Sequence, residues 1–120
     1  MHKLLVVDDE NDICDFVKTF FKDRGFHVFT ALSGEEAISM TKKERPDLIL
    51  LDIKMKGMDG LAALKHIKEL DRSIRIIMVT ALADQDKMHE AYKLGACDYI
   101  TKPLILDHLE HTVLKILKGQ

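Results

Sequence analysis

Two kinds of hydrophobic pattern alternate along the chain. Short apolar runs predict strands at residues 4–7, 26–31, 48–51, 74–79 and 99–100, and the first of these lacks alternation, as expected of a strand buried on both faces. Between the runs, apolar residues recur every three or four positions and so predict helices. The expected buried faces carry Ile13, Phe16, Val17, Phe20 and Phe21 in the first helix, Leu61, Leu64 and Ile67 in the third, and Leu106, Leu109, Val113, Ile116 and Leu117 in the last.

Capping and turn residues mark the ends of the helices. Ser33 and Glu36 have the spacing of a capping box at the start of the second helix, and Pro46 stops that helix. Asp84 is suited to cap a helix that runs to residue 94, and Gly25 and Gly95 are suited to close helices. Five strands alternating with five helices predict a parallel sheet that is covered on both faces, with right-handed crossovers. We expect residues 1–120 to form a single domain.

Composition and charge narrow the class of protein. The 18 basic and 20 acidic residues give a net charge of -2, so broad binding to nucleic acid or an anionic membrane is not expected. Cys14 and Cys97 match no zinc or redox spacing, and we expect free thiols that behave as small hydrophobic residues in a reducing cytoplasm. No apolar run is longer than that at residues 76–79, which falls far short of the roughly 18 residues of a membrane span, and no signal peptide is expected.

Polar residues follow four of the predicted strands. They are Asp8 and Asp9 after the first strand, Asp52 after the third, Thr80 after the fourth and Lys102 after the fifth. Because the carboxyl ends of parallel strands meet at one edge of a sheet, we expect these side chains to converge there. Each acid taken alone has a structural explanation, since Asp9 or Asn11 could cap the first helix and others could simply face solvent. The joint occurrence at four strand ends favours a functional site.

Three carboxylates at one place are unfavourable unless a proton or a cation compensates their charge. Mg²⁺ prefers oxygen ligands and typically uses one or two protein carboxylates. These strand ends carry no histidine or cysteine, which argues against a zinc or copper site. A carboxylate beside such an ion can attack phosphorus and form an aspartyl phosphate. Asp8 and Asp9 are adjacent and resemble metal anchors, whereas Asp52 stands alone, so we predict Asp52 as the nucleophile.

These motifs occur together, in the same order, in a known family. The segments Leu-Val-Val-Asp8-Asp9-Glu10, Leu-Leu-Asp52, Val-Thr80-Ala81 and Gly-Ala-Cys-Asp-Tyr99-Ile-Thr-Lys102-Pro103 resemble the receiver domains of bacterial two-component response regulators. The resemblance covers essentially the whole chain. It implies a flavodoxin-like α/β fold, a three-layer α/β/α sandwich with five parallel strands in the order 2-1-3-4-5 and five helices.

The resemblance also assigns roles to the site residues. Asp52 would be the phosphoacceptor for a sensor histidine kinase or a histidine phosphotransfer protein. Asp9 would bind Mg²⁺ directly, Asp8 would act largely through water, and the backbone carbonyl of Lys54 would be a further ligand. Lys102 would pair with the phosphoryl oxygens, and the Lys102–Pro103 bond would be cis.

Phosphorylation would then switch a surface, by the same resemblance. Thr80 would move toward the phosphoryl group and Tyr99 would swing inward behind it. The helix near residues 84–94, the Tyr99 strand and the last helix would present an altered face to a downstream effector domain or protein, and a homodimer could form through that face. Such a module signals and is not an enzyme.

The chain departs from the family pattern near the acceptor. Lys56 stands where many relatives have proline, so the loop is expected to be less rigid. Lys54 and Leu82 occupy two positions that influence phosphoryl hydrolysis in the family. An apolar Leu82 would hinder an attacking water and Lys54 would attract the phosphate, and we predict slow-to-moderate autodephosphorylation.

Other functions fit less well. A phosphohydrolase of the haloacid dehalogenase type needs an acid two residues after the nucleophile, where this chain has Lys54, and no P-loop pattern is present. A pseudo-receiver, which keeps the fold as an interaction module without phosphorylation, is the main alternative, yet it should lack one of the site residues. His108 and His111 form a His-x-x-His pair on a helix, but two histidines without further ligands are more often solvated.

Overall fold

The computed structural model of the chain describes residues 2–81 and 85–119, so the predicted cap Asp84 and Leu82 lie outside the described residues. Five strands and five helices alternate along the described chain. The strands are β1 (Lys3–Val7), β2 (His27–Ala31), β3 (Leu48–Asp52), β4 (Arg75–Thr80) and β5 (Asp98–Thr101). The helices are α1 (Asn11–Lys22), α2 (Gly34–Glu44), α3 (Gly60–Leu70), α4 (Gln85–Lys93) and α5 (Leu106–Gly119).

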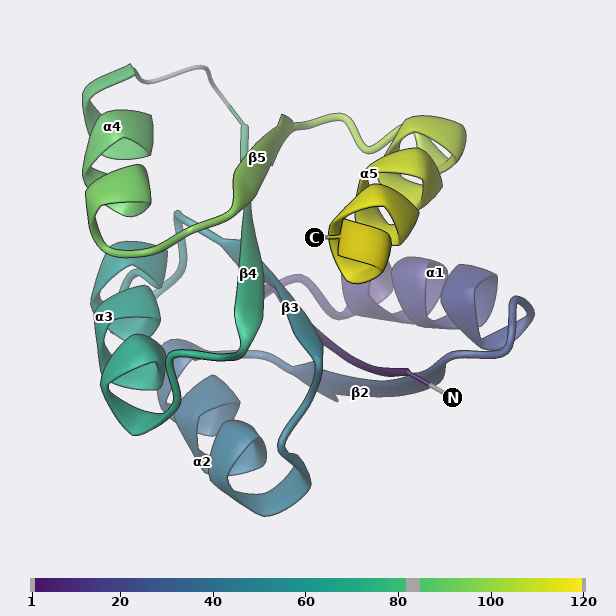
Figure 1. Cartoon of the computed structure of the whole chain (residues 1–120), viewed down its shortest axis with the longest axis horizontal. Coiled ribbons are helices and arrows are strands. Elements are labelled where there is room, and N and C mark those ends of the chain that lie inside the picture. Colours follow the sequence, from purple (N-terminus) through teal and green to yellow (C-terminus); the bar gives the residue numbers. More distant parts are fainter. Residues whose placement is uncertain (1, 82–84, 120) are drawn as a thin grey trace.

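The strands form one parallel sheet in the order β2-β1-β3-β4-β5, which confirms the predicted topology. Helices α1 and α5 cover one face of the sheet, and α2, α3 and α4 cover the other (Figure 1). Val7 pairs with Leu51, and Asp52 pairs with Val79, so the strands end nearly level with one another. The residues that follow them therefore share one edge.

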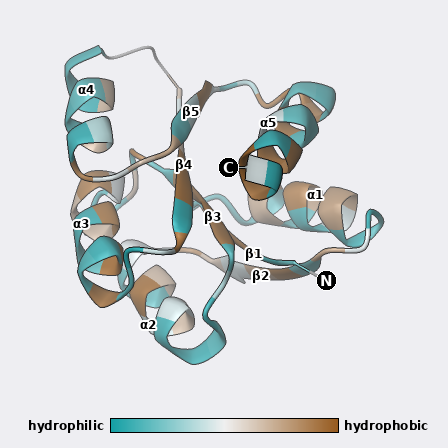
Figure 2. Ribbon diagram, in the orientation of Figure 1, coloured by the Kyte–Doolittle hydropathy of each residue, from teal (hydrophilic) through white to brown (hydrophobic). Residues whose placement is uncertain are grey.

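Alternate residues of the central strands enter two separate hydrophobic cores. Leu4 and Val6 pack toward α1 and α5, whereas Leu5 and Val7 pack toward α2, α3 and α4. Apolar residues accordingly concentrate on the strands and on the inner sides of the helices (Figure 2). A parallel strand covered on both faces must be apolar at every position, which is why these runs show no alternation.

The prediction for α1 was wrong at Phe16. Cys14, Val17 and Phe21 form the fully buried face, whereas Phe16 is 53% exposed. The helix is rotated about its axis so that the small thiol of Cys14 faces β1 and the side chain of Phe16 faces solvent. Both cysteines are free, as expected, but Cys97 is exposed and only Cys14 acts as a core residue.

Helix caps agree with the sequence in part. Ser33 Oγ accepts a hydrogen bond from the Glu36 N–H at 3.1 Å, which confirms that cap. The alternative role of Asp9 or Asn11 as a cap of α1 does not apply: Glu10 holds the cap position without a side-chain hydrogen bond, and Asn11 is the first helical residue. Asp9 instead accepts a hydrogen bond from the Lys56 N–H, in the loop between β3 and α3. None of the helices in residues 2–81 and 85–119 is both long and apolar enough to cross a membrane.

Candidate functional site

An acidic cluster lies at the carboxyl edge of the sheet. Asp52 is the last residue of β3, and Asp8 and Asp9 directly follow β1, its hydrogen-bonded neighbour. One carboxylate oxygen from each of the three residues lies within 4.8 Å of the other two. Asp8 and Asp52 are 2% and 3% exposed, whereas Asp9 is more accessible to solvent. Topology alone thus brings together acids separated by more than 40 positions in sequence.

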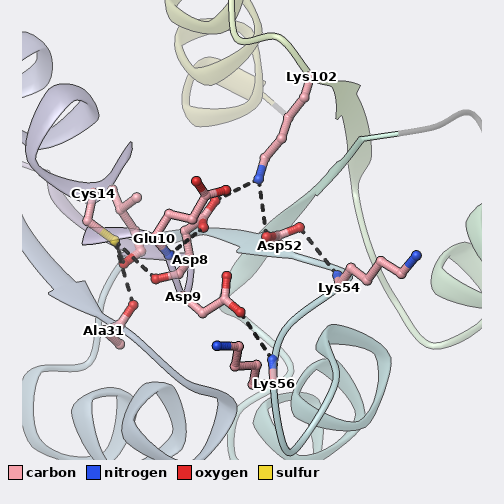
Figure 3. A network of polar contacts seen from close by, with 10 residues as sticks. Asp8, Asp9, Glu10, Cys14, Ala31, Asp52, Lys54, Lys56 and Lys102 are labelled. Atoms are coloured by element: carbon pink, nitrogen blue, oxygen red, sulfur yellow. Dashed lines mark hydrogen bonds and ion pairs between the residues drawn. The ribbon is translucent and has the colours of Figure 1, made fainter. Parts of the chain in front are cut away.

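Lys102 joins this cluster from the loop after β5. Its Nζ donates hydrogen bonds to Asp8 Oδ2 at 2.9 Å and to Asp52 Oδ2 at 3.2 Å (Figure 3). Burial alone would lower the pKa of Lys102, but its hydrogen bonds and charge interactions with the two carboxylates outweigh burial and raise the pKa. The lysine is therefore held as an ammonium. The Lys102–Pro103 peptide bond is cis.

Asp52 carries an unfavourable charge in this arrangement. Burial, followed by the neighbouring charge of Asp8, raises its pKa, while Lys102 and the Lys54 N–H oppose the shift. One ammonium is shared between two buried carboxylates, and Asp9 adds a third negative charge beside them. The excess negative charge favours binding of a cation or of a group that arrives with one.

The loop between β3 and α3 contributes two backbone donors. The Lys54 N–H donates to Asp52 Oδ1 at 3.3 Å, and the Lys56 N–H donates to Asp9 Oδ2 at 3.2 Å (Figure 3). The loop is held close to β3 because the Gly60 N–H donates to the Ile53 carbonyl at 2.7 Å. A Cβ at Gly60 would collide with the Asp52 carbonyl oxygen, so only glycine fits at this position.

Cys14 supports the loop that carries Asp8. Its thiol lies 3.4 Å from the Asp8 carbonyl oxygen, and burial followed by the charge of Asp8 raises the pKa of Cys14 to about 11. The thiol therefore stays protonated and acts as a weak donor to the backbone. Sequence reasoning missed Cys14, Gly60 and the Lys56 N–H as parts of the site, because each acts through a backbone contact that hydrophobic patterns and motif spacing do not reveal.

Thr80 lies on β4, and Tyr99 lies on the neighbouring edge strand β5. Thr80 ends β4 and is 7% exposed, and its carbonyl accepts a hydrogen bond from the Lys102 N–H at 2.7 Å. Tyr99, on β5, is 36% exposed and therefore faces outward. Its ring lies 6.1 Å from that of Tyr92 in an edge-to-face arrangement, and the Tyr92 hydroxyl donates to Asp98 Oδ1 at 3.4 Å.

The donor set of the cluster suits a hard divalent cation. All three candidate ligands are carboxylates, and the accessible side of Asp9 leaves room for the waters that Mg²⁺ retains. Within the described part of the chain, no other group of three or more His, Cys, Asp or Glu side chains is close enough to hold a metal. His108 and His111 belong to no such group.

Comparison with known proteins identifies the family. The family model for the response regulator receiver domain matches residues 4–114. This chain belongs to that family. Receiver domains are the signalling modules of two-component systems, and the acidic cluster of Asp8, Asp9 and Asp52 fits their phosphorylation site.

Three relatives illustrate the likeness of this receiver domain. Sporulation initiation phosphotransferase F of Bacillus subtilis is 40% identical over 115 residues, which cover 96% of this chain and 93% of the relative. Transcriptional regulatory protein ZraR of Salmonella typhimurium is 40% identical over 114 residues, 95% of this chain but only 26% of that longer protein. A CheX–CheY–BeF3–Mg complex from Borrelia burgdorferi superposes with a TM-score of 0.93 at 31% identity, covering 98% of this chain and 90% of that chain.

Proposed function

We propose that this receiver domain accepts a phosphoryl group on Asp52, from a histidine of a sensor kinase or of a histidine phosphotransfer protein, and thereby switches a downstream output. The proposal rests on one observation: the buried Asp52 carboxylate lies within reach of two further acids and of the Lys102 ammonium. It takes residues 1–120 as one receiver domain that acts in the cytoplasm, with the effector in another part of a longer chain or in a separate protein.

Mg²⁺ would be held by the carboxylates of Asp8, Asp9 and Asp52 and by the backbone carbonyl of Lys54. Burial, followed by the neighbouring charge of Asp8, raises the pKa of Asp52, and a nucleophile must be ionised to attack, so a cation beside Asp52 is needed to keep it charged. When bound at these residues, Mg²⁺ would neutralise negative charge on the phosphoryl oxygens and would keep Asp52 ionised. Asp8 is tethered by Lys102 and the Glu10 N–H, and so provides a fixed position for a ligand or its water.

The transfer itself requires little of the protein beyond positioning. An oxygen of Asp52 forms a bond to phosphorus while the phosphorus–nitrogen bond to the donor histidine breaks. The departing imidazole keeps the electron pair of that bond and is neutral when its other nitrogen carries the proton. Lys102, released from part of its contact with Asp52, pairs with a phosphoryl oxygen, and the Thr80 hydroxyl donates a hydrogen bond to another.

The output would follow from this new contact at Thr80. A phosphoryl group stabilises only the conformations that make extra contacts with it, so a shift of Thr80 toward Asp52 favours one state of the domain. Tyr99 is exposed now and would turn inward in that state. The surface formed by α4, β5 and α5 would then bind an effector domain or protein, or a second copy of the chain.

The donor would dock on the exposed side of α1. Phe16, Phe20 and Leu106 border a shallow hollow whose rim carries Asp12, Asp15 and Asp23. Asp12 lies in the first turn of α1, directly after the acidic loop, so a protein seated here could present a side chain to Asp52. An amphipathic helix with a basic rim complements this face in both polarity and charge.

The decisive experiment is intact-mass analysis after incubation with a small phosphodonor and Mg²⁺. We expect a single adduct of about 80 Da on the wild-type chain, which does not form when EDTA is present from the start and is absent from Asp52→Asn. Asp47→Asn, at an exposed position directly before β3 and so at the opposite edge of the sheet from the cluster, is the matched control and should be modified like the wild type. A wild-type chain that takes up no phosphoryl group would make the domain a pseudo-receiver, and an adduct on Asp52→Asn would move the acceptor elsewhere.

A further inference from the structure

The three acids of the cluster are not held equally firmly. Asp8 is buried and bonded to Lys102 and to the Glu10 N–H, and Asp52 is buried and bonded to Lys102 and to the Lys54 N–H. Asp9 is the most exposed of the three. Among the residues that the structure describes, its carboxylate has a single hydrogen-bond donor, the backbone N–H of Lys56 at 3.2 Å.

This hydrogen bond uses only one side of the Asp9 carboxylate. Oδ2 faces the β3–α3 loop, while the other oxygen is directed toward Asp8 and Asp52 (Figure 3). One Asp9 oxygen lies within 4.8 Å of a ligand atom of each of those two residues. The donor therefore fixes the carboxylate without occupying the side that faces the cluster.

We propose that the backbone N–H of Lys56 is a positioning group of the cation site, which holds Asp9 in the orientation that binds the metal. The inference rests on the proposed Mg²⁺ site and adds one residue to it. Partners that orient a ligating carboxylate in this way raise metal affinity, because less side-chain freedom is lost on binding. The ammonium group of Lys56 has no part in the effect.

The backbone at this point accommodates a direct test. Gly57, the next residue, has a φ of 78°, the value that the third residue of a type II turn requires. Proline is favoured at the preceding position of such a turn, so Lys56→Pro suits the loop while it removes the N–H. Lys56→Ala keeps the N–H and removes only the ammonium, and is the matched control.

The experiment is a titration of each purified variant with Mg²⁺ by isothermal titration calorimetry, at fixed ionic strength and without phosphodonor. We expect Lys56→Pro to raise the Mg²⁺ dissociation constant about three- to tenfold, less than the ~10- to 100-fold typical of such partners because this hydrogen bond is exposed to solvent. Lys56→Ala should stay within about twofold of the wild type. In an Asp9→Ala background, Lys56→Pro should have no further effect, since its influence passes through Asp9.

Three results would overturn the inference. An unchanged or tighter affinity in Lys56→Pro would mean that the hydrogen bond is neutral or holds Asp9 away from the ion. An equal loss in Lys56→Ala would assign the effect to the ammonium, and an undiminished loss in the Asp9→Ala background would assign it to the loop as a whole. A wild-type chain that binds no Mg²⁺ would instead overturn the proposed function, and this inference with it.

Discussion

The ammonium of Lys102 lies 2.9 Å from Asp8 Oδ2, although 94 positions separate the two residues in sequence. The same Nζ reaches Asp52 at 3.2 Å, so one cation is shared between two buried carboxylates. The two pairs lie between β1, β3 and the loop after β5, and they tie together three segments of the chain. One ammonium balances only part of the negative charge of the two carboxylates.

Lys102→Ala is expected to lower the free energy of unfolding by about 2 kcal/mol in EDTA, because it leaves two buried carboxylates without their cation. We expect a smaller loss of unfolding free energy than for a fully buried ion pair, because the Lys102 side chain is 18% exposed. Excess Mg²⁺ should restore much of the stability by binding only the folded state. Urea denaturation of the wild type and the variant, with and without Mg²⁺, checks both parts; equal losses in the two conditions would contradict the shared cation site.

Asp52→Asn is expected to raise the free energy of unfolding at neutral pH by about 1 kcal/mol in EDTA, because burial and Asp8 make the charged form of Asp52 unfavourable. The folded-state pKa lies above the ordinary value of 3.8, so the stability that protonation gives the wild type is complete below pH 3.8 and is lost as pH rises through the raised pKa. The advantage of the variant should therefore shrink as pH falls. Urea denaturation at several pH values measures the difference, and a difference that does not vary with pH would rule out this origin.

Gly60→Ala is expected to destabilise the domain by about 3 kcal/mol, because the added Cβ meets the backbone of Asp52 and Ile53 rather than a flexible side chain. Gly119→Ala is a matched control, since nothing lies within 4 Å of a Cβ at that position. Thermal and urea unfolding of both variants provide the comparison. A loss of similar size in both would show that close approach to the acceptor strand is not the cause.

The phosphoryl group on Asp52 is expected to persist beyond a few seconds at room temperature in the presence of Mg²⁺. The expectation comes from the family resemblance, by which Lys54 would attract the phosphate and an apolar Leu82 would hinder an attacking water. The decay of the phosphorylated mass after removal of the donor gives the lifetime directly. Loss within a few seconds would contradict this expectation.

The sequence by itself determined the elements and the edge at which the site forms. The runs that became β1, β3 and β4 are almost continuously apolar because both faces of the sheet are covered at these strands. The sequence alone places Asp8, Asp52 and Lys102 together because parallel strands bring their carboxyl ends to one edge. The strand order came from the resemblance to a family and not from the pattern of the chain.

Tertiary structure alone decided which contacts form at that edge and which helix faces are covered. Helical spacing did not distinguish Phe16 from Val17, because the rotation of α1 depends on how Cys14 packs against β1. Asp9 resembled a helix cap, yet its carboxylate accepts from the Lys56 N–H, a donor 47 positions away. Hydrophobic pattern reports burial along one segment, whereas the partner of a polar group depends on which backbone donors other segments bring near it.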